Sequence, residues 1–217
     1  MRNRILAAAL LIFVASLGVA RCTVAQQMID RIVAKVESDI ILLSDVRELS
    51  RYQSFLDGKS QSDEEILNRL IDQWIVRNEA SAGHFPQPSE EDIDRSIERL
   101  KRSFASPDAF EARQKQAALT DEEIRQFVRA QLYLSNYLDS RFRSVIQINE
   151  TQIKEFYEDR VAPRAKSRGE TPPPLEKARD FIQEALVQRA INEQADRWLK
   201  ESRTRVRVES LLNEKAQ

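Results

Sequence analysis

The chain has few of the residues on which common catalytic and metal sites depend. Its 217 residues include one cysteine, Cys22, and one histidine, His84. A disulfide needs two cysteines, and a structural zinc ion usually takes four cysteine or histidine ligands. A Ser-His-Asp triad would have to be built around His84, which follows Gly83 in a stretch that we expect to be a loop. We therefore expect no catalytic residues, no metal site and no cofactor.

Glycine and a strong charge of one sign are also missing. Only four glycines occur, and no glycine-rich phosphate-binding loop is among them. The 34 Lys and Arg residues nearly balance the 35 Asp and Glu residues, which gives a formal net charge of −1. Nucleic-acid binding requires a basic footprint. The composition therefore argues against both nucleotide-driven work and nucleic-acid binding.

Residues 1–25 have the pattern of a secretory signal peptide. Arg2 and Arg4 precede an uncharged apolar run over residues 5–20, and Thr23 and Ala25 are the small residues that a signal peptidase requires. The run is shorter than the about 20 residues that span a bilayer comfortably. We expect cleavage after Ala25, export to the periplasm and no membrane span in the mature chain.

Two alternatives for this segment stay open. Cys22 could carry a lipid, although Arg21 stands where a lipid-attachment site needs a small residue. The apolar run could also remain uncleaved as an anchor. Cleavage after Ala25 would remove the only cysteine, so the mature protein would be stabilised by ordinary packing.

The remainder of the chain is dominated by capped, amphipathic helical patterns. Apolar residues recur at helical spacing over residues 62–82, which gives the clearest stripe and ends at Gly83. Further helices are expected over residues 90–104, 107–119, 121–147 and 150–160, and another over residues 175–202. The expected N-caps are Ser44, Ser62, Ser89, Ser106 and Thr120.

Strand patterns occur only near the two ends of the expected mature chain. The stretch "RIVAKVESDIILL" favours a short hairpin, and "RVRVE" alternates at period two. A lone strand would leave its backbone groups unpaired, so we expect these segments to pair. The alternative is that the last fifteen residues fray. The expected fold is mainly α, a multi-helix core with a small sheet formed by the N-terminal hairpin and a C-terminal strand.

Residues 161–174, "VAPRAKSRGETPPP", interrupt this pattern. They hold Gly169 and three consecutive prolines, and we expect a linker without regular structure. The resulting organisation is a helical domain over residues 26–160, the linker over residues 161–174, and a C-terminal helix and strand over residues 175–217.

Several stretches together resemble the SurA family of periplasmic chaperones. They are "DRIVAKVESDIILLSDVRE", "ILNRLIDQWIVRNEA", "TDEEIRQFVRAQLYLSNYLDSRFRS", "INETQIKEFYED" and the closing "ADRWLKESRTRVRVES". In that family the closing helix and strand pack back onto the N-terminal region. Typical members also carry parvulin-type prolyl isomerase domains after the "FYED" helix. Residues 161–174 are too short for such a domain, so the isomerase activity is not carried over.

The resemblance implies an ATP-independent holdase for unfolded outer-membrane or secreted polypeptides. A dedicated structural or assembly partner of one envelope protein is the alternative, and a prolyl isomerase is disfavoured by the missing domain. The sequence leaves open whether the protein is a monomer or a dimer.

Candidate peptide-binding side chains are aromatic residues outside the main stripes. Tyr133 and Tyr137 share one side of a helix, and Phe104 and Phe110 flank a turn at Pro107 that is suited to a movable flap. The alternative for all four is that they complete the core.

Overall fold

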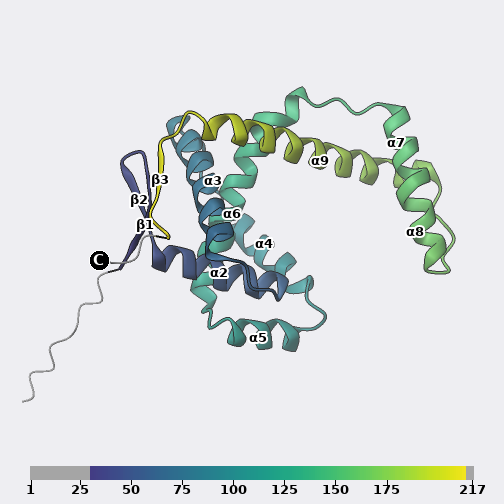
Figure 1. The fold of residues 1–217 in the computed structure, drawn as a ribbon. Coiled ribbons are helices and arrows are strands. Elements are labelled where there is room, and N and C mark those ends of the chain that lie inside the picture. Colours follow the sequence, from purple (N-terminus) through teal and green to yellow (C-terminus); the bar gives the residue numbers. More distant parts are fainter. Residues whose placement is uncertain (1–29, 214–217) are drawn as a thin grey trace, which may run out of the picture. The chain divides into compact units, whose positions relative to one another are not determined.

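The computed structural model describes residues 30–213, and Figure 1 shows their helices and strands. The expected signal peptide and its cleavage after Ala25 lie outside the described residues. Chain contacts separate Met1–Asp30 from Arg31–Gln217, and all the elements below belong to the second unit.

The elements follow one another as a hairpin, a series of helices and a final strand. Their bounds are β1 Ile32–Val36, β2 Asp39–Leu42, α2 Leu43–Asp57, α3 Asp63–Ala82, α4 Glu90–Arg102, α5 Pro107–Gln116, α6 Asp121–Phe142, η2 Arg143–Val145, α7 Glu150–Phe156, η3 Tyr157–Val161, α8 Ala162–Ser167, α9 Leu175–Arg203 and β3 Val208–Ser210.

The expected fold class is confirmed, because the chain is mainly helical with one small antiparallel sheet. The strand order is β2-β1-β3, so the C-terminal strand pairs with the first strand of the hairpin. Val36 lies opposite Val208, and Ala34 lies opposite Ser210. The strand begins at Val208, later than the alternating arginines and valines indicated. The pairing of the two ends is as expected.

Four of the five expected N-caps are confirmed. The side-chain oxygens of Ser62, Ser89, Ser106 and Thr120 each accept a hydrogen bond from the backbone N–H three residues on. Ser44 is not a cap. Helix α2 begins at Leu43 because β2 runs directly into it, and the carboxylate of Asp45 accepts the Leu42 N–H at 2.8 Å.

The expectation of an irregular linker over residues 161–174 is wrong for its first half. Helix α7 continues through the π-helical turn η3 into α8, which ends at Ser167. Pro163 is compatible with this because it lies in the first turn of α8, where its missing N–H costs no hydrogen bond. Within residues 161–174 only residues 168–174 lack regular structure, and Gly169, the second of them, has a left-handed conformation at φ 71°.

The main hydrophobic core joins the sheet to α2, α3, α4 and α6. Val36, Phe55, Ile66 and Ile93 are fully buried in it. Trp74 and Trp198 pack against it while only partly buried.

A smaller core forms where α7 meets the first half of α9. Its buried residues are Ile153, Ala178, Ile182 and Leu186. The other half of α9 carries Trp198 and Leu199, which pack on the main core. Helix α9 therefore belongs to both cores and links them.

Within residues 30–213, no helix combines the length and the apolar character needed to cross a bilayer.

Candidate functional site

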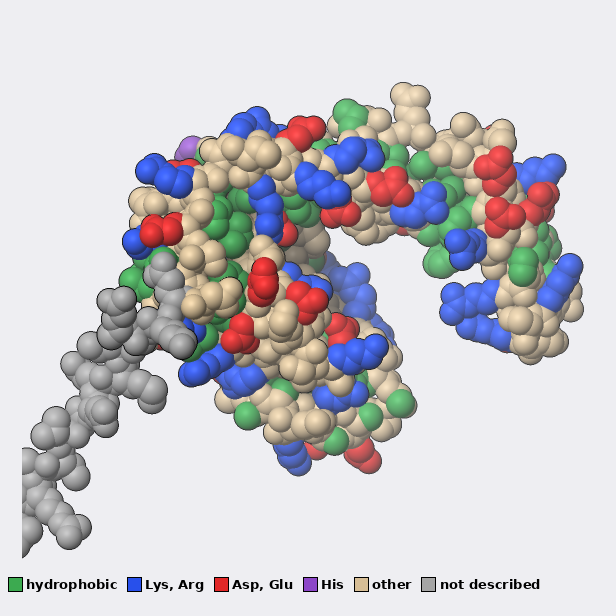
Figure 2. All heavy atoms as spheres, viewed as in Figure 1, with side chains coloured by type: hydrophobic (Ala, Val, Ile, Leu, Met, Phe, Trp, Pro, Cys, Tyr) green, Lys and Arg blue, Asp and Glu red, His purple; other side chains and the backbone are tan. Residues whose placement is uncertain are grey.

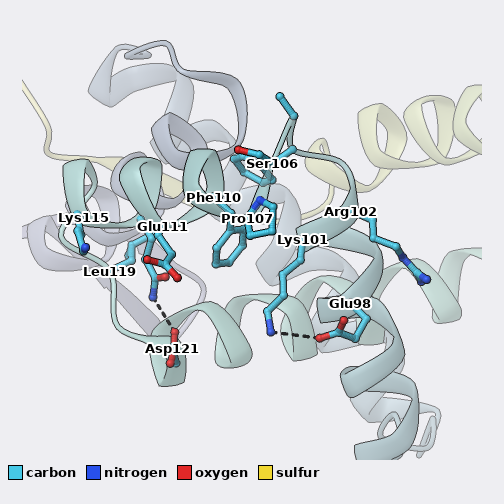
Figure 3. A pocket seen from close by; sticks show the side chains of 13 residues that line it. Glu98, Lys101, Arg102, Ser106, Pro107, Phe110, Glu111, Lys115, Leu119 and Asp121 are labelled. Carbon is cyan, nitrogen blue, oxygen red and sulfur yellow. Dashed lines mark hydrogen bonds and ion pairs between the residues drawn. The ribbon is translucent and has the colours of Figure 1, made fainter.

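A cavity with an apolar wall lies between α4, α5 and the start of α6. Helix α5 is short, and it begins where Ser106 accepts the Ala109 N–H at 3.1 Å and Pro107 fills the first turn. Its position leaves a hollow of about 800 Å³ beside the connection from α4 (Figure 3). That volume lies within the range of protein ligand sites.

The cavity combines an apolar wall with a charged rim. Phe104, Phe110 and Leu119 line it, and Figure 3 shows Phe110 and Pro107 beside the charged side chains. Its full lining is Glu98, Lys101, Arg102, Phe104, Ala105, Ser106, Pro107, Phe110, Glu111, Gln114, Lys115, Leu119 and Asp121.

Two polar contacts hold opposite sides of the rim. Lys101 forms a salt bridge with Glu98 at 3.1 Å, and the Gln114 amide donates to Asp121 at 2.7 Å (Figure 3). A smaller hollow of about 340 Å³ shares Glu98, Lys101, Phe110 and Asp121 with this cavity, so the two form one recess along α4.

The apolar wall is the outer part of an aromatic cluster. The ring centroids of Phe104 and Phe110 are 5.2 Å apart with an interplanar angle of 80°, a T-shaped arrangement. Both rings also contact Phe55 of α2, at 5.2 Å and 5.3 Å. Since Phe55 is fully buried, the wall rests directly on the main core.

The far end of α5 is tied to α2 by two arginines. The Arg113 guanidinium donates to the carbonyl oxygen of Ser54 at 3.4 Å, near the left-handed Gly58 that ends α2. Arg51 donates to the carbonyl oxygen of Ala118 at 2.7 Å and forms a salt bridge with Glu123 at 3.0 Å. These contacts fix the end of α5 remote from Phe104.

The first half of α4 is held against α6 by ion pairs. Glu90 accepts hydrogen bonds from Arg125 and Arg129 of α6, and Asp94 accepts one from Arg125. These arginines hold the pKa of the Glu90 carboxyl below its usual range. The ion pairs are exposed, so they position α4 more than they stabilise the fold.

Tyr133 and Tyr137 lie in a different part of the molecule. They are 6 % and 9 % exposed and pack with Val76, Ala80 and Phe85 against the side of α3. The structure thus brings together Phe104 and Phe110 but not the two tyrosines. The burial of the tyrosines favours the alternative that they complete the core. The same holds for Phe110, which is 7 % exposed and belongs to the main core, whereas Phe104 is only partly buried.

A basic side chain ties this tyrosine cluster to α9. Arg141 donates to the Tyr137 hydroxyl at 3.0 Å, and its guanidinium carbon lies 4.9 Å from the centroid of the Trp198 ring. The arrangement serves helix packing.

Leu119, Lys101 and Glu98 also line the cavity, although they were not among the candidates from the sequence. Leu119 lies beyond the end of α5, in the connection to α6. The rim charges carry no signal of their own, because charged residues are frequent throughout the chain.

The remaining residues that could act in catalysis or metal binding do not form a cluster. His84 lies in the loop after α3, in a left-handed conformation at φ 52°. Among residues 30–213, no group of three or more His, Cys, Asp and Glu side chains is placed to hold a metal ion.

Comparison with protein-family models gives no match for this chain, and comparison with curated proteins gives none either.

Proposed function

We propose that the protein is an ATP-independent chaperone that holds apolar segments of unfolded outer-membrane or secreted polypeptides in the periplasm. The observation that carries this proposal is the cavity of about 800 Å³ whose wall is formed by Phe104 and Phe110. A hollow of this size with an aromatic wall can receive the side chains of an unfolded chain.

Solubility of such a surface requires charge around it. The rim supplies side chains of both signs, Glu98, Lys101, Glu111 and Lys115 among them. Figure 2 shows the same mixture of acidic and basic side chains over the visible face of the helices. An apolar hollow bounded in this way stays accessible without promoting association of the chaperone with itself.

Holding works by mass action in this proposal. A chaperone that binds only the unfolded client lowers the concentration of the aggregation-prone form. Burial of one large apolar side chain contributes about 1.5–3 kcal/mol. A cavity that receives a few such side chains therefore binds reversibly, as a holdase without an energy source must.

The resemblance to the SurA family supports the same proposal, including export to the periplasm. Prolyl isomerase activity is not part of it, because the seven residues from Arg168 to Pro174 are the only irregular stretch where the family carries that domain. The protein acts here as a binding protein and not as an enzyme.

The proposal is tested by light scattering. A denatured outer-membrane protein is diluted into buffer with and without the purified protein, and the experiment is repeated with an unrelated unfolded client. We expect near-stoichiometric amounts to suppress scattering in both cases. Absence of suppression with every client would instead support a dedicated partner, and a prolyl-peptide assay with clear turnover would support the isomerase alternative.

A matched pair of variants locates the binding site. Phe104→Ala removes a ring from the cavity wall. Phe127→Ala removes another partly buried ring, whose centroid lies 4.4 Å from that of Tyr52 and which does not line this cavity. We expect suppression to fall with the first variant and to persist with the second. Equal loss in both would trace the effect to the core and not to the cavity.

A further inference from the structure

Strand β3 forms a free edge of the sheet with a defined set of outward-facing backbone groups. The Glu37 N–H donates to the carbonyl oxygen of Arg207 at 3.0 Å, and the Leu211 N–H donates to that of Val33 at 2.8 Å. Hydrogen-bonded pairs alternate along an antiparallel ladder. The N–H and C=O groups of Val208 and Ser210 therefore point away from β1, and no described strand pairs with that edge.

The side chains along this edge form two rows. Val206, Val208 and Ser210 lie on the core-facing side, since Val208 is opposite the fully buried Val36. A hollow of about 390 Å³ adjoins this row, with Leu67 and Ile71 of α3 on its other side. Val208 remains 38 % exposed although it belongs to the core-facing row. The apolar cover is thus incomplete where the sheet stops.

The opposite row carries charge of both signs. Arg205 and Arg207 are followed by Glu209, and the pairing of the strand with β1 brings Glu209 next to Lys35 at 3.2 Å. Arg207 lies 3.5 Å from Glu37 and is largely exposed. An arginine and a glutamate two positions apart on one face of a free edge are self-complementary in an antiparallel pair.

We propose that β3 pairs with β3 of a second copy of this chain, antiparallel and about a two-fold axis at Val208. Arg207 then lies opposite Glu209 of the second copy, and the reverse pair forms by symmetry. Val208 meets its own counterpart on the apolar side. The backbone groups of Val208 that face away from β1 pair across the axis.

This register is the one that the charges favour. Moving the axis to Glu209 places two carboxylates opposite each other, and moving it to Arg207 places two guanidinium groups opposite each other. A two-fold arrangement uses the same patch on both copies, as homodimer interfaces commonly do. The edge is short, so the dimer forms reversibly and depends on protein concentration. The proposal is independent of the client-binding cavity.

Sedimentation velocity over a range of concentrations tests the proposal. The protein is produced from the full-length gene, so that any processing of its N-terminus takes place in the cell. We expect a concentration-dependent monomer–dimer equilibrium for the unaltered protein. R207E and E209R should each lose the dimer, because each places like charges opposite one another.

An equimolar mixture of the two variants tests directly whether the charges act across the interface. In a mixed dimer, both cross-strand positions again carry opposite charges, so the dimer should return. Each variant loses one exposed ion pair within its own chain, to Glu37 or to Lys35. Recovery on mixing cannot arise from a repaired fold. R205E is the control, because position 205 faces Leu211 of the second copy in this register and the dimer should persist.

Three outcomes would overturn the proposal. They are a monomer at every concentration for the unaltered protein, a dimer that survives both single reversals, and no recovery when the two variants are mixed. Suppression of client aggregation should be retained by both single variants. That readout separates failure of the dimer from failure of the proposed chaperone function.

Discussion

Arg207 and Glu37 exchange two hydrogen bonds although 170 positions of sequence separate them. The Arg207 N–H donates to the Glu37 carboxylate at 2.7 Å, and the Glu37 N–H donates to the Arg207 carbonyl oxygen at 3.0 Å. Glu37 lies in the turn between β1 and β2 with φ 54°, so the turn of the hairpin receives the end of the chain. The sheet therefore ties the first and last described elements together.

Deletion from Arg203 onwards should lower the melting temperature by several degrees. It removes β3 and the hydrogen bonds from Arg203 to Asp72 at 2.7 Å and to the carbonyl oxygen of Asn68 at 2.6 Å. For a chain of this size, about 1 kcal/mol corresponds to roughly 2–4 °C. Differential scanning calorimetry measures the shift. A deletion that begins at Glu214 leaves β3 intact and serves as the control. Identical melting of both truncated chains would mean that the strand contributes nothing.

Neighbouring residues of α9 should respond very differently to truncation. Ile182 is fully buried in the smaller core, whereas Phe181 is 73 % exposed. Ile182→Ala leaves a cavity and should cost about 2–5 kcal/mol of unfolding free energy. Phe181→Ala should change it by less than about 0.5 kcal/mol. Urea denaturation measures both. A comparable loss in the two variants would contradict the assignment of the buried face of α9.

Loss of Arg143 should loosen the first half of α9. Its guanidinium bonds Asp139 of α6 at 2.7 Å and Glu184 of α9 at 2.8 Å. We expect Arg143→Met to raise amide exchange rates in residues 175–186 and in α7, because this bridge connects them to the end of α6. Arg189→Met removes only an exposed pair with Glu193 and is the control. Mass spectrometry of hydrogen exchange follows both.

Acid should remove part of the stability that Glu123 supplies. The Thr120 N–H and hydroxyl, followed by the Arg51 guanidinium, hold the pKa of Glu123 below its ordinary value of 4.5. A carboxyl whose pKa is depressed on folding stabilises the fold above its unfolded pKa, and this contribution is lost as the pH falls through the folded pKa.

Glu123→Gln isolates this effect, because glutamine can still accept the capping hydrogen bonds. The variant should be less stable than the unaltered protein at neutral pH, by no more than about 1 kcal/mol for a partly exposed pair. The difference should shrink below the ordinary pKa. Thermal unfolding across this range measures it, with Glu122→Gln as the neighbouring control. A difference that is constant with pH would exclude the charge as its source.

Local signals in the sequence sufficed for most of the fold. Ser62, Ser89, Ser106 and Thr120 begin their helices because each side chain supplies an acceptor that the first turn otherwise lacks. The pairing of the two ends followed from the need of lone strands for partners. The register that pairs Val36 with Val208 could not be predicted from the sequence, because it depends on where α9 places the start of β3 relative to the hairpin.

Two local predictions were wrong: the N-cap at Ser44 and the irregular linker over residues 161–174. Asp45 provides the acceptor at the start of α2, so Ser44 is not needed as a cap. Gly169 and the prolines at 172–174 indicated a linker over residues 161–174, yet the helix continues from α7 through η3 to Ser167, with Pro163 in the first turn of α8. Single-residue signals are weakest at such junctions between elements.

The site was only partly predictable. Phe104 and Phe110 were grouped correctly because they flank one short turn, and proximity in sequence enforces proximity in space. Tyr133 and Tyr137 lie off the apolar stripe of their helix, but α3 and Phe85 cover them. Which side of a long helix is covered depends on elements distant in sequence, and spacing along the helix does not contain that information.

Because β1 and β3 pair, the first and last described elements are adjacent, and the fold is suited to circular permutation. A short peptide that joined the last residues of the sheet to its first would close the backbone into a ring. Gly169, where an added Cβ would meet nothing within 4 Å, marks a place to reopen it. A permuted chain that started between α8 and α9 would keep all the helices and strands described here. In the same way, a second domain inserted at that point would leave the sheet and the helices on either side of it intact.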